Sequence, residues 1–230
     1  MQTFPDRNPE SAALNKPLNQ QLQEDMQLFS EVSPTLWTFG RPLPPSQNRR
    51  GVPILNTRNE HPEVKLCEND LPLRCPFNPS NYEKDDSKTR LSCVLVLDAP
   101  QIAWMNEAEA WLLAAVTERS QEFLNWNAEE TLQHFRSAVK FVDKYGTTQM
   151  SVKLNTTGRF RCVFWSPDLK ELEEMPPLED CYVVPIVRLR GIWQQPGTRM
   201  WGASWDMTHC MTQRRVQTCP FADAEMLTEE

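Results

Sequence analysis

Six basic residues lie in two stretches that contain no aspartate or glutamate, residues 148–165 and 181–205. They are Lys153, Arg159, Arg161, Arg188, Arg190 and Arg199. The second stretch also carries Trp193, Trp201 and Trp205. Cations attract phosphates and flat rings stack on bases, and grooves that hold single-stranded nucleic acid combine both. These residues therefore predict such a surface, although strand aromatics are more often core and strand arginines often only face solvent.

The charge of these stretches differs from that of the whole chain. The 230 residues have a net charge of −7 and a pI near 5.2, which argues against a polyanionic partner for the protein as a whole. The other 18 of the 24 basic residues lie in the remaining parts of the chain together with all 31 acidic residues. This segregation predicts a local basic surface on an acidic body.

A predicted hairpin positions the first group of cations. Residues 150–165 alternate apolar and polar side chains on either side of a turn at 156–158, which is typical of two strands with one buried face. After the turn, Phe160 should share one face with other apolar residues. Arg159 and Arg161 should lie on the opposite face, where cations are available to a ligand.

A second strand pair positions the other cations. Residues 182–190 read as a strand with Arg188 and Arg190 on one face, and residues 194–198 contain the proline and glycine of a turn. Earlier in the chain, residues 91–97 are apolar and β-branched without a break, which predicts a strand buried on both faces. The chain is therefore expected to be mainly β.

Two helices are predicted between the first strands and the hairpin. One, within residues 104–123, begins with Asn106 and Glu109, which are spaced as a capping box. The other begins with the same signal at Asn127 and Glu130 and should bury Leu132, Phe135, Ala138, Val139 and Val142. Both helices are interpreted as packing elements without chemistry.

The ends of the chain are expected to be tails. Twelve of the 19 prolines fall in residues 1–80, so the front third should be mostly irregular. Residues 1–33 are polar, with a short amphipathic helix indicated by Leu18, Leu22, Met26, Phe29 and Val32. Residues 41–51 read as a stiff basic linker, and residues 217–230 as an acidic tail. We expect residues 1–33 and 221–230 to be mobile.

The sequence indicates no catalytic or metal site. Its seven cysteines include no C-x-x-C pair, its three histidines are isolated, and it contains no glycine-rich phosphate loop or nucleophile motif. The acidic residues of 166–180 are interpreted as a solvated loop that lies away from any bound phosphate. We expect no enzyme activity and no cofactor. No signal peptide or membrane span is indicated, so an intracellular protein with no membrane partner is expected.

Three motifs resemble a known family. They are PLRCPF with the following S-x-Y at residues 72–82, VKLN at 152–155, and RLRGIW at 188–193 with the strand around Gly202. Together they are similar to the OB-fold single-stranded-DNA-binding proteins of nucleocytoplasmic large DNA viruses. These proteins are relatives of the T7-phage type, with homologues also in protists. The resemblance covers residues 35–213, and the acidic tail lacks the terminal aromatic residue that is common in such families.

The resemblance implies a fold and a domain organisation. The fold is mainly β, an OB-fold-like barrel in residues 34–216 with two helices inserted at 102–143, and flexible tails at 1–33 and 217–230. By motif position it implies a nucleic-acid site formed by Lys153, Arg159, Arg161, Arg188, Arg190, Trp193 and Trp201. The implied location is the nucleus or a viral replication compartment.

The expected function is sequence-nonspecific binding of single-stranded DNA in replication, repair or recombination, and RNA remains an alternative ligand. Further expected partners are replication proteins bound through the acidic tail and a second copy of the chain. The alternative function is a structural or interaction protein, such as a virion or scaffold component, that uses the same barrel without nucleic acid. Pairing of the strand arginines with the acidic residues 166–180 would favour this alternative.

Overall fold

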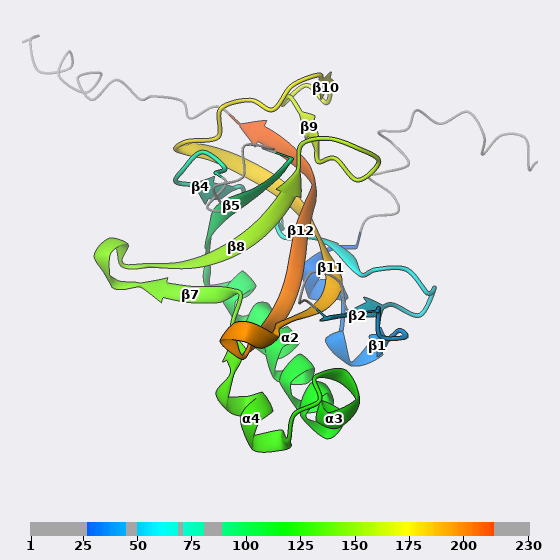
Figure 1. Cartoon of the computed structure of the whole chain (residues 1–230). Helices are drawn as coiled ribbons and strands as arrows, with labels where there is room; N and C mark the ends of the chain where they lie inside the picture. The colour runs from blue at the N-terminus through cyan, green and yellow to red at the C-terminus, as the bar shows by residue number, and fades with distance from the viewer. Residues whose placement is uncertain (1–26, 45–49, 69–70, 81–88, 214–230) are drawn as a thin grey trace, which may run out of the picture.

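Strands β11, Cys181–Gln195, and β12, Met200–Gln213, form the longest antiparallel pair of the computed structural model. β11 also pairs with β4, Leu73–Cys75, which pairs with β5, Arg90–Leu97. β5 pairs with β8, Thr147–Asn155, and β8 meets β12 in parallel, so these five strands close into a barrel (Figure 1). The predicted mainly β, OB-fold-like barrel is confirmed.

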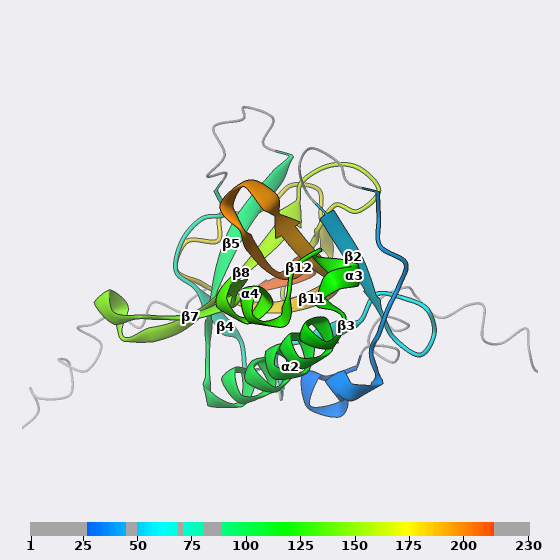
Figure 2. The same cartoon turned by 60° about the horizontal axis from the view of Figure 1, so that its bottom comes forward.

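The structure describes residues 27–44, 50–68, 71–80 and 89–213. The remaining strands are β1 Thr38–Phe39, β2 Arg50–Leu55, β3 Glu63–Lys65, β6 Phe135–Arg136, β7 Val139–Val142, β9 Val163–Trp165 and β10 Glu171–Leu172. The helices are α2 Ala99–Glu118, α3 Ser120–Phe123 and α4 Ala128–Gln133, with 3-10 turns η2 Phe29–Glu31, η3 Pro34–Leu36, η4 Asp143–Tyr145 and η5 Pro196–Thr198. The helices gather at one end of the barrel (Figure 2).

Side-chain alternation explains the barrel wall. β8 buries Met150, Val152 and Leu154 and exposes Ser151 and Lys153, as the sequence predicts. β5 alternates in the same way, with residues 91, 93, 95 and 97 buried and the intervening ones partly exposed. The prediction that this strand is buried on both faces is wrong, because the side chains on its outer face stay partly exposed.

The predicted hairpin of residues 150–165 is wrong in its second half. β9 does not pair with β8; it pairs in parallel with β12 and antiparallel with β10. β8 already has neighbours along its length, namely β5, β7 and β12, so its edges are occupied. The connecting residues 156–162 are mostly irregular, and Phe160 within them is exposed instead of buried.

The second predicted strand pair is confirmed, with η5 as its turn. Gly191 in β11 explains how β2 can pair there: a Cβ at this position would lie 2.1 Å from the carbonyl oxygen of Val52. Gly191 also has a φ of +152°, which favours glycine. This glycine therefore allows β2 to approach the barrel.

The helical insert differs from the prediction at both ends. α2 begins after Asp98, so Asn106 and Glu109 lie inside the helix and are not its cap. The capping box of Asn127 and Glu130 is confirmed, with the Glu130 amide donating to Asn127 Oδ1 at 2.8 Å. α4 ends at Gln133, however, because the following residues form β6 and β7 against β12 and β8.

An aromatic cluster fixes α2 to the barrel. The Trp104 ring of α2 contacts Trp205 of β12 with centroids 6.0 Å apart, and Trp37 contacts both. Phe29 is buried beside Trp104, so residues 27–33 belong to the body, before the predicted boundary at residue 34. The predicted N-terminal helix and the acidic tail lie otherwise outside the described residues. None of the described helices is long and apolar enough to cross a membrane.

Candidate nucleic-acid interface

Asp206 of β12 organises two arginines on the outside of the barrel. Arg90 of β5 donates from Nη2 to Asp206 Oδ1 at 3.0 Å, and Arg190 of β11 donates from Nη1 to Oδ2 at 3.2 Å. The Asp206 side chain is 5% exposed, whereas those of Arg90 and Arg190 are 44% and 43% exposed. One buried carboxylate therefore holds two guanidinium groups at the surface.

Further cations and one ring surround this trio. Lys153 of β8 is in register with Asp206 and donates from Nζ to Ser92 Oγ at 2.5 Å. The exposed ring of Phe160 lies beside the guanidinium carbons of Arg190 and Arg159, at 5.8 and 5.7 Å from the ring centroid. We call this surface the basic face; it consists of Arg90, Lys153, Arg159 and Arg190 around Asp206 and Phe160.

The basic face has a surplus of positive charge. Arg90, Arg159 and Arg190 outnumber Asp206, and the two arginines that share this carboxylate each keep further N–H groups for a ligand. Arg159 makes no ion pair among the described residues. Because Asp206 is buried and both arginines are anchored, their positions are fixed before any anion arrives. Chemically, this arrangement can bind phosphates beside a ring that is 56% exposed.

A groove of about 1000 Å³ adjoins the basic face at Arg159 and Phe160. Its floor includes Arg188, whose Nη2 lies 3.2 Å from Glu63 Oε2, so this arginine is neutralised. Thr208 also donates its hydroxyl to Glu63. The structure thus places Arg188 beside the basic face without adding to its net charge.

His209 lines the same groove. Trp165 Nε1 donates to His209 Nδ1 at 3.2 Å, which requires that this nitrogen carries no proton. Burial lowers the pKa of His209 below its ordinary value; the charge of Arg188 lowers it further, whereas Glu63 and Glu171 have smaller effects in the opposite direction. The imidazole is therefore neutral at neutral pH and presents an uncharged surface.

Arg161 and Arg199, two of the six cations, lie outside the basic face. Arg161 Nη2 contacts Glu171 Oε1 at 2.6 Å, and Glu171 belongs to the acidic residues 166–180. One arginine of the predicted site is therefore paired with the acidic segment. Arg199 Nη1 lies 3.6 Å from Glu130 Oε1 beside α4. The prediction that all six cations share one surface is therefore wrong for Arg161 and Arg199.

The tryptophans also require correction. Trp201 is 0% exposed and donates from Nε1 to the Thr131 carbonyl at 2.7 Å, so its ring packs in the core beneath α4 and offers no face for a base. Trp205 is buried in the aromatic cluster. Trp193 is half-buried and donates to the Ala203 carbonyl at 3.1 Å. The exposed ring of the basic face is Phe160.

Three residues of the basic face were missed by sequence reasoning: Arg90, Phe160 as an exposed ring, and Asp206. Arg90 immediately precedes the apolar run 91–97, and alternation from Leu91 would have placed it on the outer face. Asp206 directly follows the acid-free stretch 181–205. Its contacts with Arg90 of β5 and Arg190 of β11 could not be predicted from the spacing of residues along the sequence.

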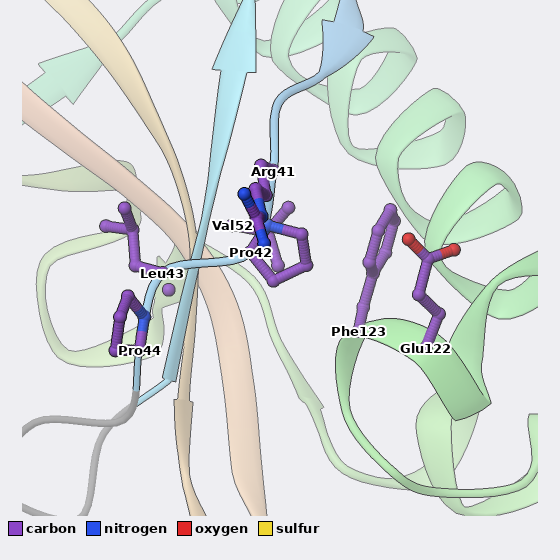
Figure 3. Close-up of a pocket in the computed structure, with 8 residues that line it drawn as sticks. Arg41, Pro42, Leu43, Pro44, Val52, Glu122 and Phe123 are labelled. Carbon is purple, nitrogen blue, oxygen red and sulfur yellow. The ribbon is translucent and has the colours of Figure 1, made fainter.

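A second hollow, of about 670 Å³, lies between residues 41–44 and α3 (Figure 3). Figure 3 shows Arg41 on one side and Glu122 with Phe123 on the other, a lining without a surplus of either charge. Among the residues that the structure describes, no group of histidine, cysteine, aspartate or glutamate could hold a metal ion. The basic face therefore remains the best candidate site.

The described cysteines are free thiols, mostly buried. Burial raises the pKa of Cys162 to about 12, which keeps this thiol protonated. Cys75 and Cys93 lie with their sulfur atoms 3.5 Å apart in the core. Most of these cysteines therefore pack as core residues.

No family model and no curated protein matches the chain. Among solved structures, it is similar to the single-stranded DNA-binding protein from bacteriophage Enc34 in complex with ssDNA, at 16% identity and a TM-score of 0.44, covering 76% of this chain and 94% of that chain. It is also similar to gp2.5, a single-stranded DNA binding protein encoded by bacteriophage T7, at 11% identity and a TM-score of 0.48, covering 74% and 96%.

At these values the similarity carries no conclusion about this chain, and its function has to be inferred from its own residues. The solved structures are of phage proteins. Membership of the family from nucleocytoplasmic large DNA viruses therefore stays a prediction.

Proposed function

We propose that this protein binds single-stranded nucleic acid, DNA in the first instance, without sequence specificity and without catalysis. The observation that supports this most is the anchoring of Arg90 and Arg190 by the buried Asp206, which with Arg159 leaves three arginines against one carboxylate beside the exposed Phe160 ring. Cations neutralise phosphates irrespective of sequence, and a ring stacks on any base.

The role in the cell follows from this chemistry. A protein that coats single strands serves replication, repair or recombination, and we propose that role, with replication proteins as partners, in the nucleus or a viral replication compartment. A structural or interaction protein is the second candidate. It is favoured by the neutralisation of Arg161 and Arg188 by Glu171 and Glu63.

Binding to a labelled single strand tests the proposal. With a mixed-sequence strand of about 16 nucleotides, anisotropy should report binding whose log affinity falls with log salt at a slope of about −2 to −3.5, for about three to five neutralised phosphates. Arg159→Glu with Phe160→Ala should weaken binding at least about tenfold. These residues hold no described ion pair or core position, so the fold should persist.

Lys170→Glu is the matched control, because it makes the same charge change at an exposed position in residues 166–180. It should leave affinity within about twofold at moderate salt. If the unaltered protein shows no salt-dependent binding to the strand, the nucleic-acid function is wrong and the structural role takes its place.

A further inference from the structure

A second basic surface continues from the basic face along β8. Ser151 and Gln149 share the outer face with Lys153, because side chains alternate along a strand. Lys140 of β7 lies directly opposite Gln149 in the antiparallel register, so it belongs to the same face. It is exposed and about 13 Å along the strand from Lys153.

The charged residues of these strands are of one sign, and at the tip of the following turn Lys144 lies next to Asp143. β5, β7 and β8 together contain three charged residues, Arg90, Lys140 and Lys153, and all three are cations. The uncharged Ser151 and Gln149 separate Lys153 from Lys140 on β8, and Val94 and Val96 lie beside them on β5. A polyanion that leaves the basic face along β8 would therefore meet another cation and no strand carboxylate.

Aromatic rings lie at the tip of the β7–β8 arm, the hairpin that projects from the barrel (Figure 1). Tyr145 at the tip contacts Phe77 with ring centroids 5.9 Å apart, and Lys144 Nζ lies 5.2 Å from the Tyr145 ring centroid. Phe77 follows β4, and β4 and β8 flank β5, so this contact crosses β5. Both rings are exposed, so they meet outside the barrel.

The base of the arm is anchored. Glu109 of α2 is buried and accepts hydrogen bonds from the Ser137 hydroxyl at 2.5 Å and from the Ala138 amide at 2.7 Å, immediately before β7. At the tip, Gly146 has a φ of +59° and closes the turn into β8. The arm thus presents Lys140 and Tyr145 from a fixed base.

We propose that the β7–β8 arm, through Lys140, Lys144 and the Tyr145–Phe77 ring pair, is a second contact for the same single strand. It extends the length of nucleic acid held beyond the basic face. This inference rests on the proposed function. It adds the path of the single strand, which runs from Phe160 past Lys153 to the arm. The arm combines cations with rings, the combination that single-strand sites use.

Strand length separates the two contacts. Lys140→Glu with Tyr145→Ala in the full chain should lower affinity for a strand of about 16 nucleotides at least fivefold, and for one of about 6 nucleotides less than twofold. Phe77→Ala, which removes the other ring of the pair, should give the same length-dependent loss. Melting temperatures near that of the unaltered protein would show that the variants fold.

Phe141→Ala provides the matched control. Phe141 is an exposed ring on the same arm but on the opposite face of β7 from Lys140, so its removal should leave both affinities unchanged. Lys170→Glu controls for the change in net charge. An equal loss with Phe141→Ala would overturn the proposed path, since the effect would not depend on the outer face.

The outcomes distinguish this inference from the proposed function. If the arm variants bind both strands normally while Arg159→Glu with Phe160→Ala weakens binding to both, the arm contact is wrong and the function stands. If the unaltered protein binds neither strand, both fall together.

Discussion

Two arginine–carboxylate contacts on the barrel differ in burial and in charge. Arg161 and Glu171 connect the segment before β9 to β10 as one exposed pair, with side chains 43% and 45% exposed. Arg90 and Arg190 instead share the buried Asp206. The first contact sums to zero charge and the second to a surplus of one positive charge.

The difference shows how an acidic protein can present a basic surface. An exposed pair gains little energy, because solvent screens it and both long side chains must be ordered. A buried carboxylate must be compensated, so it holds its partners firmly, and with two of them it leaves positive charge facing outward. The number and burial of carboxylates therefore decide the local charge more than the count of arginines does.

The largest expected effect is on stability. It is measured in two separate variants, one without the Asp206 carboxylate and one without the Glu171 carboxylate. In Asp206→Asn the amide oxygen can accept from one guanidinium group, but the buried amide NH2 then faces the other, which is also a donor. We therefore expect a loss of about 1–3 kcal/mol in the free energy of unfolding. Glu171→Gln should cost less than about 1 kcal/mol. Urea denaturation with unchanged m-values measures both. Equal losses would show that Asp206 does not differ from a surface acid.

A smaller effect is expected on nucleic-acid binding, through the two arginines. Arg190→Gln removes one phosphate contact while Arg90 still compensates Asp206, so the salt slope should become shallower by about 0.7. Arg161→Gln should leave the slope unchanged, because that guanidinium is already paired with Glu171. The measurement is affinity for one strand across a salt series. If the salt slope changed equally for Arg190→Gln and Arg161→Gln, the nucleic-acid site would extend over β9 and β10 as well.

Local pattern predicted much of this fold. Alternation located the buried residues of β8, and turn chemistry located the hairpin of β11 and β12. The capping box at Asn127 marked the start of α4. Each of these signals lies within a few residues of the structure it specifies.

What the sequence could not predict depends on contacts between distant segments. The pairing of β9 with β12, for example of Phe164 with Cys210, 46 residues apart, is not encoded in any local signal, so the pattern of residues 150–165 alone predicted a hairpin. The prediction of the site was incomplete for the same reason. Asp206 is adjacent to the acid-free stretch in sequence, but its partnership with Arg90 spans 116 positions.

The smallest expected effect concerns His209, whose pKa depends first on burial and then on the charges of Glu63, Arg188 and Glu171. Burial lowers its pKa in the folded protein, so the unfolded chain binds the proton first as the pH falls. Stability present above the ordinary histidine pKa of about 6.5 should therefore decline as the pH falls toward the folded value.

Replacing the imidazole tests this sign. His209→Asn keeps an acceptor for Trp165 Nε1 but cannot titrate, so the difference in unfolding free energy between the unaltered protein and this variant should shift by on the order of 1 kcal/mol or less between pH about 7.5 and about 5.5. The unaltered protein should be the one that loses stability on acidification. A difference that stays constant across this range would mean that His209 is as readily protonated in the folded protein as in the unfolded chain. In that case Trp165 would lose its acceptor as the imidazole is protonated, and the groove beside the basic face would gain a cation at mildly acidic pH.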